Sequence, residues 1–274
     1  MELALDGKKV FAYTAAHELD LNKPSLVFVH GAGLDHSSFG LQSRYFGYHG
    51  FNVLAVDLPG HGRSDGPPIE SIENLSAWIS KFLNALEIKT TTVVGHSMGA
   101  LVALEFAARH PESAERIALI GVAFPMKVSE AFLDAARRDD PAAYDMDTIW
   151  GHAPQVPLAG NPNPGMWMYG DTLARLSRLK PGVLHSDLKA CNDYADGMDS
   201  SGKVACPALF VLGARDMMTP SRGAESLING IKNSRSVRID RSGHSLMAEA
   251  PDATLDALIE FILGSSAGSR GGKS

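Results

Sequence analysis

The sequence predicts an α/β fold in which a mostly parallel central sheet is flanked by helices and carries an inserted helical lid. Short apolar runs typical of buried strands alternate with helical segments in residues 1–123 and 203–264, a pattern that indicates a parallel sheet covered on both faces. Residues 124–202 lack such runs, and a cluster of Pro, Gly and Asn at 154–165 divides them. We expect the first two ranges to form the core, residues 124–202 to form the lid, and the Gly/Ser-rich residues 265–274 to form a disordered tail.

Bulk composition narrows the class of protein. With 274 residues the chain can bury a full core, and its net charge of −6 argues against a nucleic-acid partner. The first residues lack the basic start of a signal peptide, and no apolar run is long enough to span a membrane. Cys191 and Cys206 have no metal-type spacing, so we expect a reduced, cytoplasmic protein with no metal.

The elements of the core follow in a regular order. Asp6 and Gly7 separate two short apolar runs and predict a hairpin at the N-terminus. Six later runs are expected to form buried strands, at residues 25–30, 52–57, 91–94, 117–120, 208–212 and 236–239. Helices are expected at about residues 41–48, 72–86, 100–108, from 221 onward, and at 252–263.

A tight turn joins the expected strand at 91–94 to the helix that follows it. Its sequence is Gly95-His96-Ser97-Met98-Gly99, which fits the strand–turn–helix context of a nucleophile elbow. The flanking glycines leave room for the turn, and the serine side chain is expected to project at the positive N-terminal end of the helix. Ser97 is therefore the candidate nucleophile.

An acid and a histidine follow later expected strands. Asp216 comes just after the strand at 208–212, and His244 lies in the loop after the strand at 236–239. The carboxyl ends of parallel strands are where sites form in open α/β sheets. Ser97, Asp216 and His244 thus occur in the order nucleophile, acid, base, each on a loop after a strand.

Four motifs together resemble the α/β-hydrolase superfamily, in its group of esterase-like serine hydrolases with a helical lid. They are His30-Gly31-Ala32-Gly33, Asp57-Leu58-Pro59-Gly60-His61-Gly62-Arg63-Ser64, Gly95-His96-Ser97-Met98-Gly99 and Gly243-His244. The likeness covers roughly residues 26–263, and the spacing from Gly213 through Asp216 to Pro220 also fits. Residues 121–123 offer no acid at the alternative position that the family uses.

The resemblance implies a Ser-His-Asp triad that acts without a cofactor. His244 would take the proton of Ser97, and Asp216 would orient and stabilise the imidazole. The backbone N–H groups of Ala32 and Met98 would form the oxyanion hole. His30 and His61 are expected to brace loops, and His96 is expected to pack in the elbow without carrying a proton. Asp57 and Asp65 are expected to be structural.

The substrate is expected to be a small molecule, with ester hydrolysis as the leading function. We expect small to medium acyl esters or lactones, and a pocket lined in part by Met126, Trp150 and Trp167 from the lid. The alternatives are a cofactor-free C–C bond hydrolase, lyase or perhydrolase, and a receptor-like binder with little turnover. A dicarboxylate or diketone acid would need convergent cations, for which the lid offers Arg137, Arg138, Arg175, Arg178 and Lys180.

Overall fold

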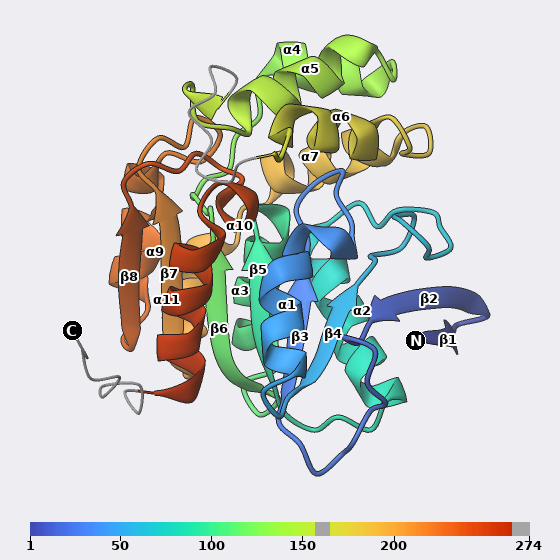
Figure 1. Cartoon of the computed structure of the whole chain (residues 1–274), viewed down its shortest axis with the longest axis vertical. Coiled ribbons are helices and arrows are strands. Elements are labelled where there is room, and N and C mark those ends of the chain that lie inside the picture. The colour runs from blue at the N-terminus through green and yellow to red at the C-terminus, as the bar shows by residue number, and fades with distance from the viewer. Residues whose placement is uncertain (157–164, 265–274) are drawn as a thin grey trace.

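A central eight-stranded sheet organises the computed structural model, which describes residues 1–156 and 165–264 (Figure 1). The strands follow the spatial order β1-β2-β4-β3-β5-β6-β7-β8. Their bounds are β1 (Glu2–Leu5), β2 (Lys8–Tyr13), β3 (Ser25–Val29), β4 (Asn52–Val56), β5 (Thr91–His96), β6 (Ala114–Ile120), β7 (Ala208–Gly213) and β8 (Ser234–Ile239). This is the α/β-hydrolase fold that the sequence predicted.

Strand pairing is parallel from β4 to β8 and antiparallel at the N-terminal edge. Phe28 of β3 lies opposite Ala55 of β4 and Val94 of β5, which sets the register at the centre of the sheet. The predicted hairpin is confirmed, because β1 pairs antiparallel with β2 across Asp6 and Gly7. Both turn residues have positive φ, 52° and 73°, as a tight hairpin turn requires.

Helices cover both faces of the sheet. The pairs α1 (Gly40–Gly47) and α11 (Pro251–Leu263), and α2 (Ile72–Ala85) and α3 (Met98–Arg109), lie on opposite faces (Figure 1). The remaining short elements of the core are η1 (His36–Phe39), α8 (Gly197–Lys203), η3 (Ser221–Ala224), α9 (Glu225–Gly230) and α10 (Leu246–Glu249). The helix expected from residue 221 is therefore a 3₁₀ turn followed by α9, and α10 was not predicted.

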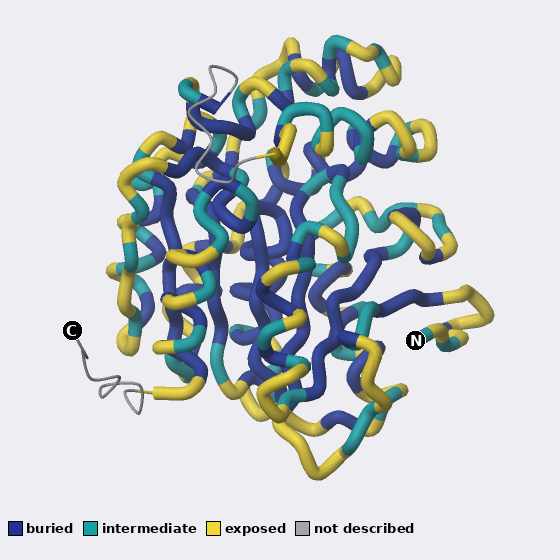
Figure 2. Tube along the Cα trace, viewed as in Figure 1, coloured by how far each residue is buried: buried dark blue, intermediate teal, exposed yellow. Residues whose placement is uncertain are grey.

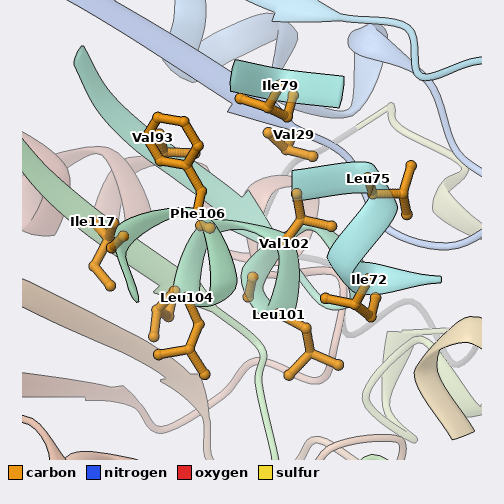
Figure 3. Close-up of a cluster of buried hydrophobic side chains, with 14 of the residues drawn as sticks. Val29, Ile72, Leu75, Ile79, Val93, Leu101, Val102, Leu104, Phe106 and Ile117 are labelled. Carbon is orange, nitrogen blue, oxygen red and sulfur yellow. The ribbon is translucent and has the colours of Figure 1, made fainter. Parts of the chain in front are cut away.

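Alternate residues of each buried strand supply two separate cores. Val27 and Val29 of β3 pack with α2 and α3, whereas Leu26 and Phe28 of the same strand pack with α1 and α11. Figure 3 shows part of the first cluster, with labelled side chains from α2, from α3 and from strands β3, β5 and β6. Figure 2 shows the consequence: the central strands are buried, and exposed positions lie on β8 and on the outer sides of the helices.

Four helices of the predicted lid segment, residues 124–202, lie beyond the carboxyl ends of the strands (Figure 1). They are α4 (Glu130–Arg137), α5 (Pro141–Trp150), α6 (Met168–Leu176) and α7 (Val183–Asp193). Phe132, Leu176, Leu184 and Leu188 give them a buried apolar cluster of their own. Another helix of the segment, α8, packs instead against α3 of the core. Residues 157–164 and the predicted tail, 265–274, lie outside the described residues.

No helix in the described ranges combines the length and apolar character needed to cross a membrane.

Candidate active site

Close contact between β3, β5 and α3 forms the turn that carries Ser97. A Cβ on Gly95 would lie 2.0 Å from the carbonyl oxygen of Gly99, and a Cβ on Gly99 would lie 2.1 Å from that of Val29. Only glycine fits these two positions, because any other residue would overlap the main chain. Ser97 itself has φ 53° and ψ −116°, an uncommon backbone conformation for a residue with a side chain.

The strained turn leaves the Ser97 hydroxyl available. Ser97 precedes the first turn of α3, yet its side chain makes no capping hydrogen bond to that helix. It lines a cavity of about 370 Å³ under the lid segment, together with His244. Within the described ranges the hydroxyl has no hydrogen-bond partner, so a substrate or His244 can engage it.

Asp216 and His244 form a buried hydrogen-bonded pair. Nδ1 of His244 donates to Oδ2 of Asp216 at 2.8 Å, and the two side chains are 5% and 0% exposed. Thr219 fixes the carboxylate, since its backbone N–H donates to Oδ1 and its hydroxyl donates to Oδ2, each at 2.7 Å. The pairing leaves Nε2 of His244 as the ring nitrogen that can act on a bound molecule.

The pair shifts both pKa values away from their usual range. Burial acts to lower the pKa of His244, but the charge of Asp216 and its hydrogen bond outweigh burial, so the pKa is raised above 6.5. Burial acts to raise the pKa of Asp216, but the charge of His244 and the hydrogen bonds from His244 and Thr219 outweigh it and lower the pKa. The imidazolium form of His244 is thus stabilised.

Glu249 of α10 holds the loop that carries His244. Its buried carboxylate accepts hydrogen bonds from the backbone N–H groups of Gly243 at 3.0 Å, Ser245 at 3.1 Å and Ala153 at 3.0 Å. The last of these ties the lid segment to the same loop. Sequence reasoning did not identify Glu249, because α10 is only one turn long and has no periodicity.

His96 packs against His244, which is the packing role predicted for it. The two rings lie 4.7 Å apart, and Nε2 of His96 donates to the backbone carbonyl of His244 at 2.9 Å. Burial, with the nearby charge of His244, lowers the pKa of His96 to about 3. His96 is therefore neutral at physiological pH and fixes position without carrying a proton.

Asp187 of α7 ties together the two N-terminal motif loops. Its Oδ2 accepts a hydrogen bond from the backbone N–H of Gly33 at 2.8 Å and lies 2.7 Å from Nε2 of His61. Nδ1 of His61 faces the carbonyl oxygen of Pro59 at 3.1 Å, so both ring nitrogens face acceptors and both must donate. Burial opposes this charged form, but Asp187 outweighs burial and raises the pKa of His61.

The contact with Gly33 places Asp187 behind the loop that contains Ala32. Ala32 lines the cavity, and Met98 is the first residue of α3, where a backbone N–H has no acceptor within its helix. These are the two positions expected to supply oxyanion-hole donors. Asp187 escaped sequence reasoning because it lies 154 residues from Gly33 and in no motif.

Asp57, expected to be structural, holds the loop after β4. Its carboxylate accepts hydrogen bonds from the backbone and Nδ1 of His36 and from the backbone of Arg63. Asp35, His36 and Asp57 lie close enough together to resemble a metal-binding group. Their atoms are already engaged in hydrogen bonds within the loop, with Asp35 bound to Ser37, so we assign them no metal.

The three predicted pocket residues separate into two groups. Met126 and Trp150 line the cavity, and the Trp150 ring packs edge-on to Phe132 at 5.7 Å. Trp167 does not line it: the residue is 77% exposed, and its ring packs against Gly170 of the helix that follows. The reason is local, because Trp167 precedes α6 and its ring turns outward over the first turn of that helix.

The predicted cations of the lid do not converge. Arg175 is the one member of that set lining the cavity, and it is ion-paired with Asp171. Arg137 and Arg138 are 62% and 64% exposed and pair with surface carboxylates. Lys180 points to the carbonyl of Ser64, and Arg178 bonds to the carbonyl of Ala174.

Comparison with known proteins gives a family match over most of the chain. Residues 26–257 match the model of the Alpha/beta hydrolase family. A pimeloyl-(acyl-carrier protein) methyl ester esterase of Aromatoleum aromaticum is 29% identical over 252 residues, covering 85% of this chain and 95% of the relative. An (E)-2-((N-methylformamido)methylene)succinate hydrolase of Acinetobacter baylyi is 22% identical over 243 residues, covering 86% and 89%.

Solved structures agree with the fold. The enol-lactonase of Burkholderia xenovorans superposes with a TM-score of 0.83 at 22% identity, covering 96% of this chain and 100% of that one. An esterase from Exiguobacterium antarcticum gives a TM-score of 0.82 at 20% identity, with 95% and 97% covered.

The contact between Asp187 and His61 generates a prediction about stability. Asp187→Asn removes the anion beside a buried, doubly donating imidazole, and breaking such a pair costs about 3 kcal/mol or more of the free energy of unfolding. The folded pKa of His61 is raised, so this contribution is fully present below pH 6.5 and is lost as pH rises through the folded pKa. Urea denaturation from pH 5.5 to 9 measures the difference between variant and parent.

Asp193→Asn is the matched control, because Asp193 lies on the same helix and pairs with Lys189 at the surface. Exposed pairs contribute only about 0–1 kcal/mol. Equal losses in the two variants, or a loss for Asp187→Asn that grows with pH, would contradict the charged pair.

Proposed function

Because this chain belongs to the alpha/beta hydrolase family, we propose that it is a serine hydrolase that cleaves carboxylic esters through an acyl-enzyme. The observation that carries the proposal is the buried Asp216–His244 pair, which shares one cavity with a strained serine whose hydroxyl is unengaged. These are the groups that acyl transfer needs: a nucleophile, its base, and the acid that orients the base.

In the proposed mechanism His244 acts first as base and then as acid. Neutral Nε2 takes the proton of Ser97 as the hydroxyl oxygen attacks the ester carbonyl carbon. The imidazolium, stabilised by Asp216, then gives its proton to the departing alcohol oxygen, which leaves an acyl group on Ser97. Water attacks the acyl carbon in the second half, again with His244 as base, and the acid is released.

The negative oxygen of each tetrahedral intermediate is assigned to the backbone N–H groups of Ala32 and Met98. Both belong to rigid surroundings: Met98 begins α3, and the loop of Ala32 is held at Gly33 by Asp187. Donors that are fixed before the reaction need no reorganisation as charge develops.

The cavity supports small to medium acyl esters or lactones as substrates. Its volume of about 370 Å³ lies at the small end of ligand sites, and its walls include Met126 and Trp150. Relatives bear the names of a methyl ester esterase and an enol-lactonase.

Residues 124–202 would act as the lid that excludes water from the acyl-enzyme. Two free cysteines are consistent with the proposed cytoplasmic location.

The first prediction from the proposed function is that Ser97→Ala abolishes ester hydrolysis and leaves the fold intact. Removal of the nucleophile should lower kcat on a p-nitrophenyl ester by about 10⁶-fold. A fluorophosphonate probe followed by peptide mass spectrometry should label Ser97 alone. Label on Ser64 or Ser245, or an alanine variant with substantial kcat, would remove Ser97 from this role.

The second prediction concerns pH. Only neutral His244 can act as base, and its pKa is raised, so kcat/KM should rise with pH to a midpoint above 6.5. Asp216→Asn removes the charge that raises this pKa, so the midpoint should move to lower pH while kcat falls steeply. Asp57→Asn is the control and should leave the midpoint unchanged. A profile that is flat from pH 5 to 9 in folded enzyme argues against His244 as base.

The third prediction concerns the acyl pocket. Trp150→Ala opens the cavity wall, so short acyl esters should lose efficiency while longer ones lose less or gain. Trp167→Ala should leave the preference unchanged, because that side chain is exposed outside the cavity. The measurement is kcat/KM for acetyl through decanoyl p-nitrophenyl esters beside a melting curve. Identical chain-length profiles for parent and Trp150→Ala would exclude Trp150 from the pocket.

A further inference from the structure

Asp147 of α5 places an unpartnered carboxyl group in the cavity that contains Ser97 and His244. The residue is only 8% exposed, and its carboxyl oxygens make no hydrogen bond or ion pair with any part of the chain that the structure describes. Buried carboxyl groups are ordinarily hydrogen-bonded or paired, because an unpaired charge away from water is unfavourable. A partner for this group is therefore missing.

The other buried carboxylates of the site already have partners. Asp216 binds His244 and Thr219, and Glu249 accepts three backbone N–H groups. Asp187 binds His61 and Gly33. None of these is free for a ligand, whereas Asp147 has the same burial without the bonds.

The neighbouring cations of the cavity are engaged elsewhere. Arg175 pairs with Asp171, and Lys127 donates to the backbone carbonyl of Asn192 at 2.7 Å. His152 lies on the chain just after α5 and faces the carbonyl of Thr148, and burial lowers its pKa. Among the described residues Asp147 therefore makes no ion pair, and the charge that acts on it is that of His244, which already pairs with Asp216.

The rest of the wall suits a weakly hydrated cation. Met126, Met168, Met218 and Met247 line the cavity with polarisable thioethers, and Trp150 supplies an aromatic ring. Burial raises the pKa of Asp147 to about 7, against the opposing effect of His244, so the anion is accessible near neutral pH. The net charge of −6 also favours approach by a cation.

We propose that Asp147 forms a subsite for an ammonium group of the substrate, so that the enzyme prefers esters that carry a protonated or quaternary nitrogen. The proposal rests on the proposed esterase function and adds the chemical class of its substrate. An anionic acyl group is disfavoured by the same carboxylate. Asp147 acts on specificity through charge and takes no part in bond making.

Two pairs of isosteric esters test the proposal, one pair for each side of the ester. In the first, p-nitrophenyl 4-(trimethylammonio)butanoate is compared with p-nitrophenyl 5,5-dimethylhexanoate. In the second, acetylcholine is compared with 3,3-dimethylbutyl acetate. Within each pair only the charge changes, so the ratio of kcat/KM for cationic over neutral ester isolates the subsite. At least one ratio should fall about tenfold or more in Asp147→Asn.

Asp145→Asn is the matched control, because Asp145 is an exposed carboxylate two residues away on the same helix. Its ratios should equal those of the parent. The parent ratio should also rise from pH 6 to 8 as Asp147 ionises, and in Asp147→Asn it should not. Turnover of either ester requires neutral His244, so the ionisation of His244 cancels in the ratio. The other titratable groups of the cavity are present in both the parent and Asp147→Asn, so a difference between the two profiles reports Asp147; these groups are His96, His152, Asp171, Arg175 and Lys127.

A binding measurement separates failure of the subsite from failure of the proposed function. Butyltrimethylammonium alone should bind the parent more tightly than Asp147→Asn in calorimetry, whether or not any ester is hydrolysed. Turnover of the neutral esters with ratios that Asp147→Asn leaves unchanged would overturn the subsite and leave the esterase intact. Absence of ester turnover with retained, Asp147-dependent ammonium binding would overturn the esterase alone. Equal ammonium binding by the parent and Asp147→Asn overturns the subsite.

Discussion

The close approach of α3 to the carboxyl ends of β3 and β5 determines the geometry around Ser97. At Gly95 and Gly99 the main chains are too close for a Cβ atom, and Ser97 in the turn between them has a positive φ. Ser97 N donates to the carbonyl of Ile120 at 2.9 Å, which fixes the turn to β6 as well. A strained residue persists only where its surroundings determine it this tightly, and the buried faces of α2 and α3 supply that support.

Buried carboxylates then hold the surrounding loops against this rigid centre. Asp57, Asp187 and Glu249 lie on three different segments, and each accepts backbone N–H groups from a loop that borders the cavity. The N–H groups of a loop have no carbonyl partners in a regular strand ladder, so these carboxylate side chains act as their acceptors. Two of the contacts cross between the lid segment and the core, through Asp187 and through Ala153. The positions of α5 and α7 are thereby coupled to the loops of Ala32 and His244.

Local patterns predicted the parts of the molecule that are determined locally. Neighbouring residues determine the strand runs, the hairpin at Asp6 and Gly7, and the family motifs. These local patterns were enough to predict the mostly parallel sheet. The candidate triad was found because each member follows a strand end, where parallel strands bring loops together. The catalytic roles of these residues remain a proposal, although the structure brings Asp216 within hydrogen-bonding distance of His244.

Residues determined by distant contacts were not predictable in this way. Asp187 and Glu249 bond to partners up to 154 residues away. Asp147 stands out because it lines the cavity without a hydrogen-bond partner among the described residues. Trp167 was expected in the pocket because an aromatic ring follows the Pro-rich break, but which way a ring turns at a helix start depends on packing that no periodicity records.

The central claim is that Ser97 carries an acyl group during turnover. Rapid acid quench during the reaction with p-nitrophenyl pivalate, whose bulky acyl group slows deacylation, followed by digestion and mass spectrometry, tests this directly. The account predicts one pivaloyl group on the peptide that contains Ser97, formed together with a burst of one equivalent of p-nitrophenol. Steady release of p-nitrophenol with no acyl adduct, or an adduct on any other residue, would contradict it.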